Sequence, residues 1–427
     1  MQISNIVLSA TNKIKPLLLK ILPYEFLRYM KGKMIHNSFS KMEKAIIKPF
    51  DRTQYPDGIN LVGAIKVETG LGQSCRLVVA ELEASKVPFS VYQYEQLGAM
   101  VNGDYESYND RISSKLPYNI NLIHINPHEL GLAFQQSHEK IWNGRYNIGF
   151  WLWELEEFPD EWVPCFHCLN EIWTPSEFTS NSIRKKTDLP VITIPYHVSP
   201  EVPKDPPHSY RKMFGLPEDK FLFLMMYDRN SMTERKNPQG VLEAYKRAFT
   251  DGRDADSAGL VIKVNNPTEH EIAMIRAMVS DHHNVYFITK TLTRNQVNEL
   301  IYCVDTVVSL HRAEGFGLVL AEAMMLGTPT IATDWSSNTE FMNSDVACMV
   351  KAKLVEIRED TGVFKKGNLW ADPDIDQAAM YMKRLYEDEI YGTELTQKAK
   401  VYIAEHLGMQ RAAEQIRTRV EAIYKET

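Results

Sequence analysis

Two glutamates and the glycine loop that links them are the residues best placed to do chemistry. Glu314 opens the sequence EGFG, and seven residues separate it from Glu322. Apolar runs predict a strand over 306–310 and a helix over 318–326, so the loop opens a helix. Backbone N–H groups and the positive end of the helix dipole would face a ligand there, which suits a phosphate. Glu322 would lie about two turns down the helix, on a face similar to that of Glu314.

A second loop, residues 228–237, carries the positive charge that such a ligand needs. It holds Arg229, Arg235 and Lys236 and precedes a helix that begins at Pro238, a position where proline favours a helix start. Cations on this loop could clamp a diphosphate from the side opposite the glycine loop and stabilise its departure. The alternative is an ordinary solvated charged loop.

The elements that position these loops alternate between strands and helices. Helices are expected between the strands, and helices alone after residue 374. This order predicts an α/β fold of two Rossmann-like, doubly wound domains that face a central cleft. Short apolar runs predict strands over 59–65, 87–94, 119–126, 146–156, 171–175, 191–198, 221–227, 259–264, 285–289, 306–310 and 328–333.

A stretch with four prolines, residues 200–209, reads as the linker between the two domains. Ligands of doubly wound sheets bind beyond the carboxyl ends of the strands. Four loops are therefore expected to line one cleft: 66–72, 124–128, 228–237 and 311–317. The predicted division is a basic amphipathic extension over 1–50, a first domain over 51–199, the linker, a second domain over 210–395, and C-terminal helices over 396–427 that cross back to the first domain.

Composition narrows the classes of function. The 427 residues are 44% hydrophobic and 24% charged, as in an ordinary globular protein. A formal net charge of −7 argues against nucleic acid as the main partner. Five cysteines at irregular spacings indicate a reducing, cytoplasmic setting rather than a disulfide scaffold. Cys165 and Cys168 have no second pair at zinc-site spacing, so core packing is favoured over a metal.

The first 48 residues differ from the rest of the chain. They hold nine lysines and arginines against two glutamates, with apolar clusters between the charges. Such a mixture can lie on an anionic membrane surface. The alternative is a helical extension packed on the first domain. No apolar run is long enough to predict a helix that spans a membrane.

The quoted motifs resemble those of a known family. The run Glu314-Gly-Phe-Gly-Leu-Val-Leu-Ala-Glu322 resembles the E-x7-E signature of retaining glycosyltransferases of family 4, or group 1 glycosyltransferases, which have the GT-B fold. Ser231 and the run 234–238 resemble the phosphate-binding loop of this family, and Thr69-Gly-Leu-Gly72 resembles its first-domain glycine loop. WLWEL at 151–155 resembles a branch that acts in bacterial surface-polysaccharide assembly. The resemblance covers about residues 58–425.

The resemblance implies roles for the second-domain residues. Glu314 would contact the donor sugar and Glu322 the ribose. Lys236 would hold the diphosphate, and both Arg229 and Arg235 compete for the role of its partner cation. Backbone amides that face sugar and phosphate would come from Gly315, Phe316, Gly317 and Leu318.

For the first domain the resemblance implies fewer contacts. Gly70 and Gly72 would belong to the glycine loop of this domain and bind substrate. His124 would help to hold the donor sugar or the acceptor. His128 is the alternative, and so is a histidine with a structural hydrogen bond.

The resemblance also implies a reaction. A hexose-type sugar would move, with retention, from a nucleoside diphosphate to a lipid-linked or saccharide acceptor, in the synthesis of a surface polysaccharide such as lipopolysaccharide or capsule. The family attacks from the front face, the leaving phosphate takes the proton of the acceptor, and neither metal nor cofactor is needed. The enzyme would work in the cytoplasm, peripherally at the inner membrane. The rivals are a non-catalytic subunit that binds nucleotide sugar, and a phosphorylase or epimerase.

Overall fold

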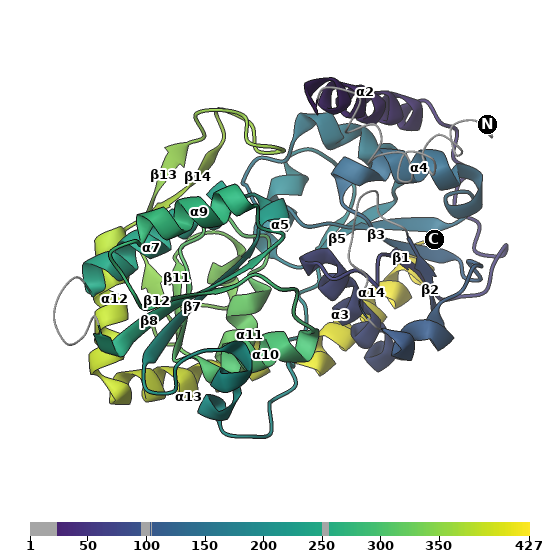
Figure 1. Cartoon of the computed structure of the whole chain (residues 1–427). Helices are drawn as coiled ribbons and strands as arrows, with labels where there is room; N and C mark the ends of the chain where they lie inside the picture. Colours follow the sequence, from purple (N-terminus) through teal and green to yellow (C-terminus); the bar gives the residue numbers. More distant parts are fainter. Residues whose placement is uncertain (1–23, 95–102, 104, 250–255) are drawn as a thin grey trace.

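The computed structural model describes residues 24–94, 103, 105–249 and 256–427, which form two α/β domains (Figure 1). The first domain is built on a six-stranded parallel sheet in the order β2-β1-β3-β4-β5-β6. Every residue of β1, β3 and β4 is buried, as expected for a parallel sheet covered on both faces. The strands are β1 Ile59–Gly63, β2 Phe89–Gln93, β3 Ile120–His124, β4 Tyr146–Phe150, β5 Glu171–Thr174 and β6 Val191–Thr193.

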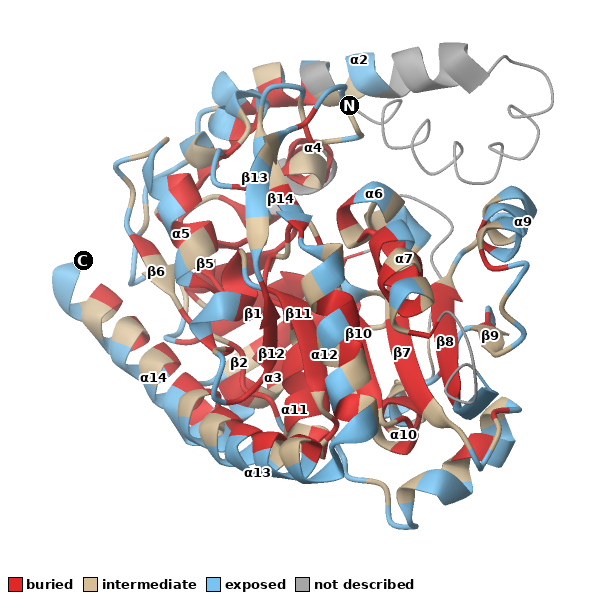
Figure 2. Ribbon diagram, turned by 90° about the vertical axis from the view of Figure 1, so that its left-hand side faces the viewer, coloured by how far each residue is buried: buried red, intermediate tan, exposed pale blue. Residues whose placement is uncertain are grey.

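The second domain has a parallel six-stranded sheet of its own, in the order β12-β11-β10-β7-β8-β9. Figure 2 shows the central strands β7, β10 and β11 buried and the surrounding helices exposed on their outer sides. The sheet thus confirms the prediction of two doubly wound domains. Its strands are β7 Phe221–Asp228, β8 Ala258–Asn265, β9 Val285–Ile288, β10 Thr306–Ser309, β11 Thr330–Thr333 and β12 Cys348–Val350.

Helices cover both sheets. In the first domain they are α2 Tyr24–Glu43, α3 Gly70–Ser85, α4 Pro127–Ile141 and α5 Glu177–Arg184, with 3-10 helices η1 Glu106–Arg111 and η2 Asp160–Cys168. In the second they are α6 Thr233–Lys236, α7 Pro238–Ala248, α9 Glu269–Met278, α10 Arg294–Cys303, α11 Leu318–Leu326 and α12 Ile375–Glu387, with 3-10 helices η3 Pro207–Phe214, η4 Arg229–Ser231 and η5 Ser337–Glu340. The chain ends with α13 Glu389–His406 and α14 Met409–Glu426.

The strand orders identify where ligands should bind. Successive strands go to opposite sides of the sheet after β1 in the first domain and after β7 in the second, and crevices form at these switch points. The loops that leave β1, β3, β7 and β10 are those expected from the sequence to line the cleft, at 66–72, 124–128, 228–237 and 311–317. Both switch points therefore present the loops that carry the candidate residues.

Helix α14 belongs to the second half of the chain but lies along α3 of the first domain (Figure 1). The hydroxyl of Tyr424 accepts a hydrogen bond from the backbone N–H of Gly58 at 2.8 Å, and Arg419 forms an ion pair of 2.6 Å with the buried Glu171. Helix α13 packs on α11, in the second domain. The stretch 396–427 thus spans the end of α13 and all of α14, and it connects the two domains.

A two-stranded hairpin that the sequence did not predict forms a second connection. Strands β13 (Ala352–Glu356) and β14 (Leu369–Pro373) are antiparallel and leave the second domain after β12. The tip of the hairpin carries Phe364, whose ring stacks on Trp153 of the first domain with centroids 5.4 Å apart. This contact places a second-domain side chain in the aromatic core of the first.

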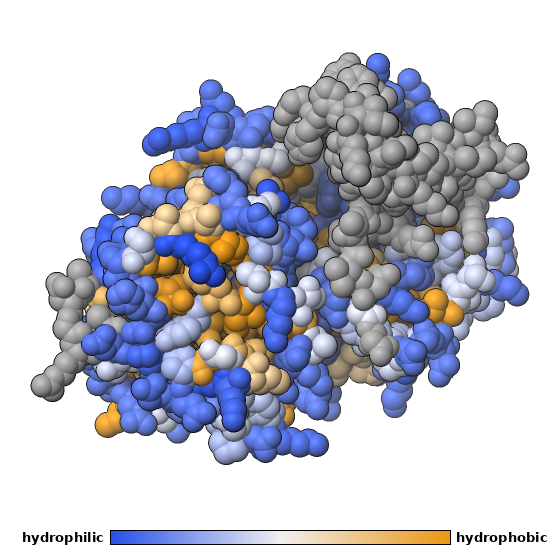
Figure 3. All heavy atoms as spheres, viewed as in Figure 1, coloured by the Kyte–Doolittle hydropathy of each residue, from blue (hydrophilic) through white to orange (hydrophobic). Residues whose placement is uncertain are grey.

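Helix α2 packs on α4 and η2 of the first domain, and its Phe39 and Met42 are buried. For this part of the N-terminal extension the structure shows the packed alternative, while residues 1–23 lie outside the described part. Ile46 follows the helix and is 88% exposed. Among the described residues, no helix has the length and hydrophobicity needed to cross a membrane. On the face in Figure 3, hydrophobic residues gather over the second domain, with hydrophilic ones around them.

Several local expectations need correction. Helix α3 begins at Gly70, inside the expected loop 66–72, because Thr69 caps it by accepting from the N–H of Gly72 at 3.1 Å. The loop 228–237 contains the short helix α6. The strand expected over 146–156 ends at Phe150.

Candidate active site

The cation loop and the glycine loop of the second domain are bonded to each other. Lys236, at the end of α6, donates to the carboxylate of Glu314. Arg235 is 3% exposed, donates to the carbonyl of Ala313 at 2.8 Å, and lies 3.7 Å from the same carboxylate. The backbone N–H of Arg312 donates to the carbonyl of Arg235 at 2.7 Å. Two loops from neighbouring strands thus bring two cations to one carboxylate.

The charges in this cluster control each other's protonation. Burial alone would raise the pKa of Glu314, but Lys236 and Arg235 outweigh it and lower the pKa to about 2. Burial lowers the pKa of Lys236, and the charge of Glu314 opposes that shift. Glu314 is therefore ionised at neutral pH. Because it is already held by two cations, it is suited to accept hydrogen bonds from hydroxyls rather than protons.

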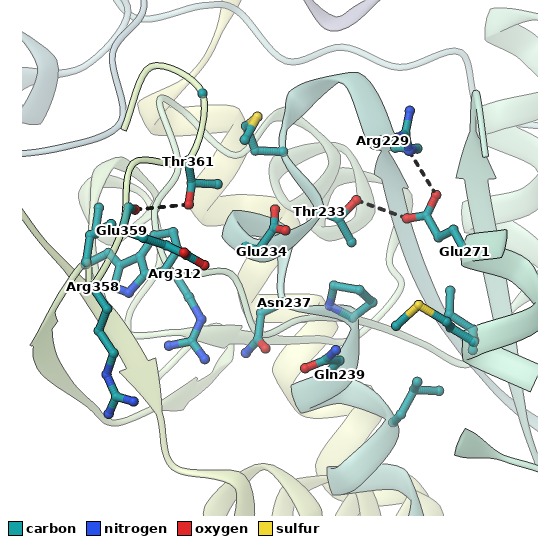
Figure 4. A pocket seen from close by; sticks show the side chains of 18 of the residues that line it. Arg229, Thr233, Glu234, Asn237, Gln239, Glu271, Arg312, Arg358, Glu359 and Thr361 are labelled. Carbon is teal, nitrogen blue, oxygen red and sulfur yellow. Dashed lines mark hydrogen bonds and ion pairs between the residues drawn. The ribbon is translucent and has the colours of Figure 1, made fainter. Parts of the chain in front are cut away.

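Arg229 lies apart from this cluster. Its guanidinium is 47% exposed and pairs with Glu271 at 3.6 Å. Figure 4 shows the pair on one wall of a pocket of about 1040 Å³ between α7, α9 and the hairpin β13–β14, with Arg312 and Arg358 across from it. Of the two arginines considered as the partner of Lys236, the structure places Arg235 beside it.

The glycine loop turns sharply into α11. Gly317 precedes the helix with φ of 96°, a conformation that L residues with a side chain rarely adopt. Phe316 is buried, and its ring meets Tyr196 of the first domain at 4.9 Å between centroids. Leu318 is the first residue of α11 and is half-buried. Gly315 is also buried, because the first domain's residues 152–154 lie over it. The four predicted backbone contacts therefore lie in the seam between the domains.

Glu322 lies in α11 and is 3% exposed. One of its oxygens accepts from Arg294, the first residue of α10, and among the described residues the other oxygen has no hydrogen-bond partner. Burial raises the pKa of Glu322, and Arg294 opposes that shift. An acceptor atom of this kind, buried and unpaired, fits a ligand hydroxyl.

The two glycines predicted for the first domain differ. Gly72 is buried inside α3, and a Cβ atom there would overlap the carbonyl oxygen of Val67. Gly70, the first residue of α3, is exposed and has open space where a Cβ would be. Close packing explains why residue 72 is a glycine. Of these two glycines, only Gly70 has room for a ligand beside it.

His124 ends β3 and is 5% exposed. Its Nε2 atom lies 2.6 Å from the hydroxyl of Ser74, which also bonds the hydroxyl of Tyr196. Burial lowers the pKa of His124 to about 4, so the ring is neutral at neutral pH. His128, the alternative, is 41% exposed on α4. The structure thus gives His124 a structural hydrogen bond that links β3 to α3, and Ser74 in turn links α3 to Tyr196 after β6.

Comparison with known proteins identifies the second domain. Residues 208–402 match the model of the family described as glycosyl transferases group 1. These residues form a group 1 glycosyltransferase domain. No curated protein matches the sequence.

Over most of its length the chain shares its fold with solved GT-B glycosyltransferases. Anabaena HepE, in complex with UDP and glucose, aligns with a TM-score of 0.62 at 11% identity over 86% of this chain and 100% of its own. An E. coli protein described as trehalose-6-phosphate, bound with UDP-2-fluoro glucose, aligns at 0.59 and 8% identity over 85% and 98%. S. aureus TarM, in complex with UDP, aligns at 0.51 and 15% identity over 74% and 57%. These likenesses confirm the GT-B fold.

Sequence reasoning missed two charged residues that meet the glycosyltransferase domain's cluster. Arg294 pairs with Glu322, and its position after the helix cap Thr293 gave no signal of that contact. Glu154 comes from the first domain and lies 3.8 Å from Arg235. The alternation in WLWEL could have found Glu154, because it puts the tryptophans on one side and Glu154 on the other.

Proposed function

We propose that this chain is a glycosyltransferase that takes a sugar from a nucleoside diphosphate sugar and passes it to a hydroxyl of an acceptor. The observation that carries the proposal is the cluster of Lys236, Arg235 and Glu314 beside the start of α11. Two cations and a helix N-terminus supply fixed positive charge where a diphosphate would depart, and such preorganised charge stabilises a leaving anion.

The donor would span the carboxyl edge of the second sheet. Glu314 would accept hydrogen bonds from hydroxyls of the sugar, and Lys236 and Arg235 would bind the diphosphate. The unpaired oxygen of Glu322 would accept a hydrogen bond from a ribose hydroxyl. UDP-glucose is the first donor to test, because solved structures with this fold hold UDP or UDP-glucose.

The experiment compares UDP-, GDP- and dTDP-sugars by thermal shift and by slow hydrolysis to the free nucleoside diphosphate. At least one donor should raise the melting temperature and be hydrolysed. Binding without turnover would favour the non-catalytic alternative. If none of the sugars binds, the glycosyltransferase proposal fails.

Retention and independence from metal are part of the proposal. Lys236 and Arg235 supply the positive charge that a divalent ion supplies in other transferases. Treatment with EDTA should therefore leave hydrolysis of the donor unchanged. Lost activity that Mg²⁺ or Mn²⁺ restores would contradict metal independence, and the anomeric configuration of the product, read by NMR, tests retention.

We also propose that the acceptor is a saccharide or a lipid-linked saccharide of a surface polysaccharide, reached at an anionic cytoplasmic membrane surface. Exposed Lys41, Lys44 and Lys48 flank the exposed Ile46 at the end of α2, a pattern that suits anionic headgroups. Replacing the three lysines with glutamate, which reverses their charge, should lower co-sedimentation with phosphatidylserine vesicles. The same reversal at the exposed residues Lys351, Lys353 and Lys366 should leave it unchanged, and equal sedimentation of both variants would refute the membrane contact.

A further inference from the structure

The pocket of about 1040 Å³ on the second domain is separate from the cluster around Glu314 (Figure 4). Helices α7 and α9 form one side of it, and the hairpin β13–β14 forms the other. Thr233 and Glu234 of α6 line the pocket, whereas Arg235 and Lys236 of the same helix pair with Glu314. The pocket and the cluster therefore lie on two sides of one short helix.

The hairpin wall of this pocket is held at both ends. At its tip, Phe364 is buried and stacks on Trp153 of the first domain. At its base, the backbone N–H of Ala371 donates to the carbonyl of Arg312 at 2.8 Å, and the guanidinium of Arg312 bonds the carboxylate of Asp372 at 2.7 Å. A wall fixed in this way is preformed, which lowers the entropic cost of binding a ligand.

Trp370 gives the hairpin wall an aromatic surface. Its side chain lines the pocket and is only partly buried, and the guanidinium of Arg312 lies 5.4 Å from the ring centroid. Asp372 is two residues further along β14, so it lies on the same face of the strand. An aromatic ring beside a carboxylate and a guanidinium offers an apolar surface to the C–H groups of a sugar ring and hydrogen bonds to its hydroxyls.

The charge of the pocket distinguishes between classes of ligand. Five carboxylates line it, against three arginines and one histidine, so the pocket does not attract an anion such as a nucleotide or a phosphate. Two of the arginines are already paired, Arg312 with Asp372 and Arg229 with Glu271. These charges favour a neutral ligand with many hydroxyls, to which paired carboxylates and guanidiniums can form hydrogen bonds.

The helix side of the pocket is apolar. Leu242 of α7 lines it, together with Ile275 and Met278 of α9, and Met274 of α9 is 47% exposed there. A saccharide combines apolar C–H faces with polar edges, and so matches a pocket that has both kinds of wall. The volume reaches the upper end of the range of about 300–1,000 Å³ found for small-molecule sites, so the pocket has room for several linked sugars.

We propose that this pocket binds a neutral oligosaccharide, at a site separate from that of the donor. This inference goes beyond the proposed function. Sugar rings would pack against Trp370 and against the apolar helix side, and their hydroxyls would bond Asp372 and Arg312. A chain held there would lie about one turn of α6 away from Lys236, and thus near the place proposed for the transferred sugar.

The test uses the full-length protein and an array of neutral oligosaccharides and of oligosaccharides that contain uronic acid, without a nucleotide sugar. Neutral oligosaccharides should bind. Trp370→Ala should weaken the binding of the tightest of them by about tenfold or more, as measured by isothermal titration. Leu369→Ala is the matched control and should bind as wild type does, because Leu369 precedes Trp370 on β14, is 43% exposed and points to the opposite face.

Asp372→Ala is a second variant, at a side chain that is 53% exposed, and it should weaken binding as well. The melting temperature shows whether each variant is folded. Three results would each overturn the proposal: no neutral oligosaccharide binds, those with uronic acid bind more tightly, or affinity is unchanged in Asp372→Ala or in a folded Trp370→Ala. Hydrolysis of UDP-glucose by wild type tests the proposed function separately. A protein that binds the oligosaccharide but hydrolyses no nucleotide sugar would keep this site and lose that function.

Discussion

Both domains turn the carboxyl edge of a parallel sheet toward the seam between them, yet the side chains at the two edges differ. At the second-domain switch point, five side chains are charged and paired: Lys236 and Arg235 with Glu314, and Arg294 with Glu322. In the first domain, His124 at the end of β3, Ser74 in α3 and Tyr196 after β6 form a neutral hydrogen-bonded network near the switch point. Glu154 is the first-domain charge that reaches the cluster of the second.

This difference follows from what each edge has to hold. A diphosphate needs fixed positive charge, and cations are kept in place by carboxylates that are themselves buried. An acceptor hydroxyl, as proposed for the first-domain side, is neutral and would need shape and hydrogen bonds. A shared architecture therefore does not imply shared chemistry, because the residues at the strand ends determine what each crevice binds.

The largest effect is expected from removing positive charge on the second-domain side. Lys236→Ala should lower kcat/KM for UDP-glucose hydrolysis by about 1000-fold, because a preorganised cation at the leaving group is lost. Arg229→Ala is the matched control, since Arg229 pairs with Glu271 outside the cluster and should retain activity within about threefold. Release of UDP is the measurement. Equal losses in both variants would mean that Arg229 and Lys236 act in one site.

On the first-domain side, the next effect is one of stability. Gly72→Ala should lower the free energy of unfolding by about 3 kcal/mol, because the new methyl group overlaps the backbone of Val67. Gly70→Ala, two residues earlier in open space, should change it by less than about 0.5 kcal/mol. Urea denaturation measures both. Lower turnover in Gly70→Ala at unchanged stability would support a ligand contact at Gly70, whereas a stable Gly72→Ala would refute the packing role.

The sequence predicted the local elements of the second-domain side well. Helix α11 has the bounds expected from its apolar run, strand β11 lies inside the predicted range 328–333, and α7 begins at Pro238 as its proline indicates. Local propensity and caps decide these features. The sequence did not show which of Arg229 and Arg235 lies beside Lys236, because Met232 between them adopts a positive φ of 72° and redirects the chain. The stacking of Phe364 on Trp153 and the approach of Glu154 depend on packing between domains that no local pattern encodes.

The neutral network of the first domain can be tested by pH. The pKa of His124 is about 4 in the folded protein, below its ordinary value near 6.5, so between these values the unfolded chain binds more protons. The free energy of unfolding should therefore fall as pH is lowered, by about 2 kcal/mol between pH 7 and 5 from this group. His124→Gln should lose this part of the pH dependence. His128→Gln, at a half-exposed site, should follow wild type; the same slope in all three proteins would contradict a neutral buried His124.

The smallest expected effect lies where the two sides meet, at Gly315. Its backbone does not require glycine, and a Cβ atom there would make ordinary contacts of 3.5 to 3.6 Å with residues 152–154. Gly315→Ala should therefore leave stability within about 0.5 kcal/mol of wild type. The methyl group would nevertheless occupy space between the donor loop and Glu154, so affinity for UDP-glucose should fall by about tenfold, or about 1.4 kcal/mol. Isothermal titration measures it, and Gly392→Ala, with similarly ordinary contacts in α13, is the control. Unchanged affinity would place the donor away from Gly315. The donor would then contact only the charged second-domain side and not the point where the two domains meet.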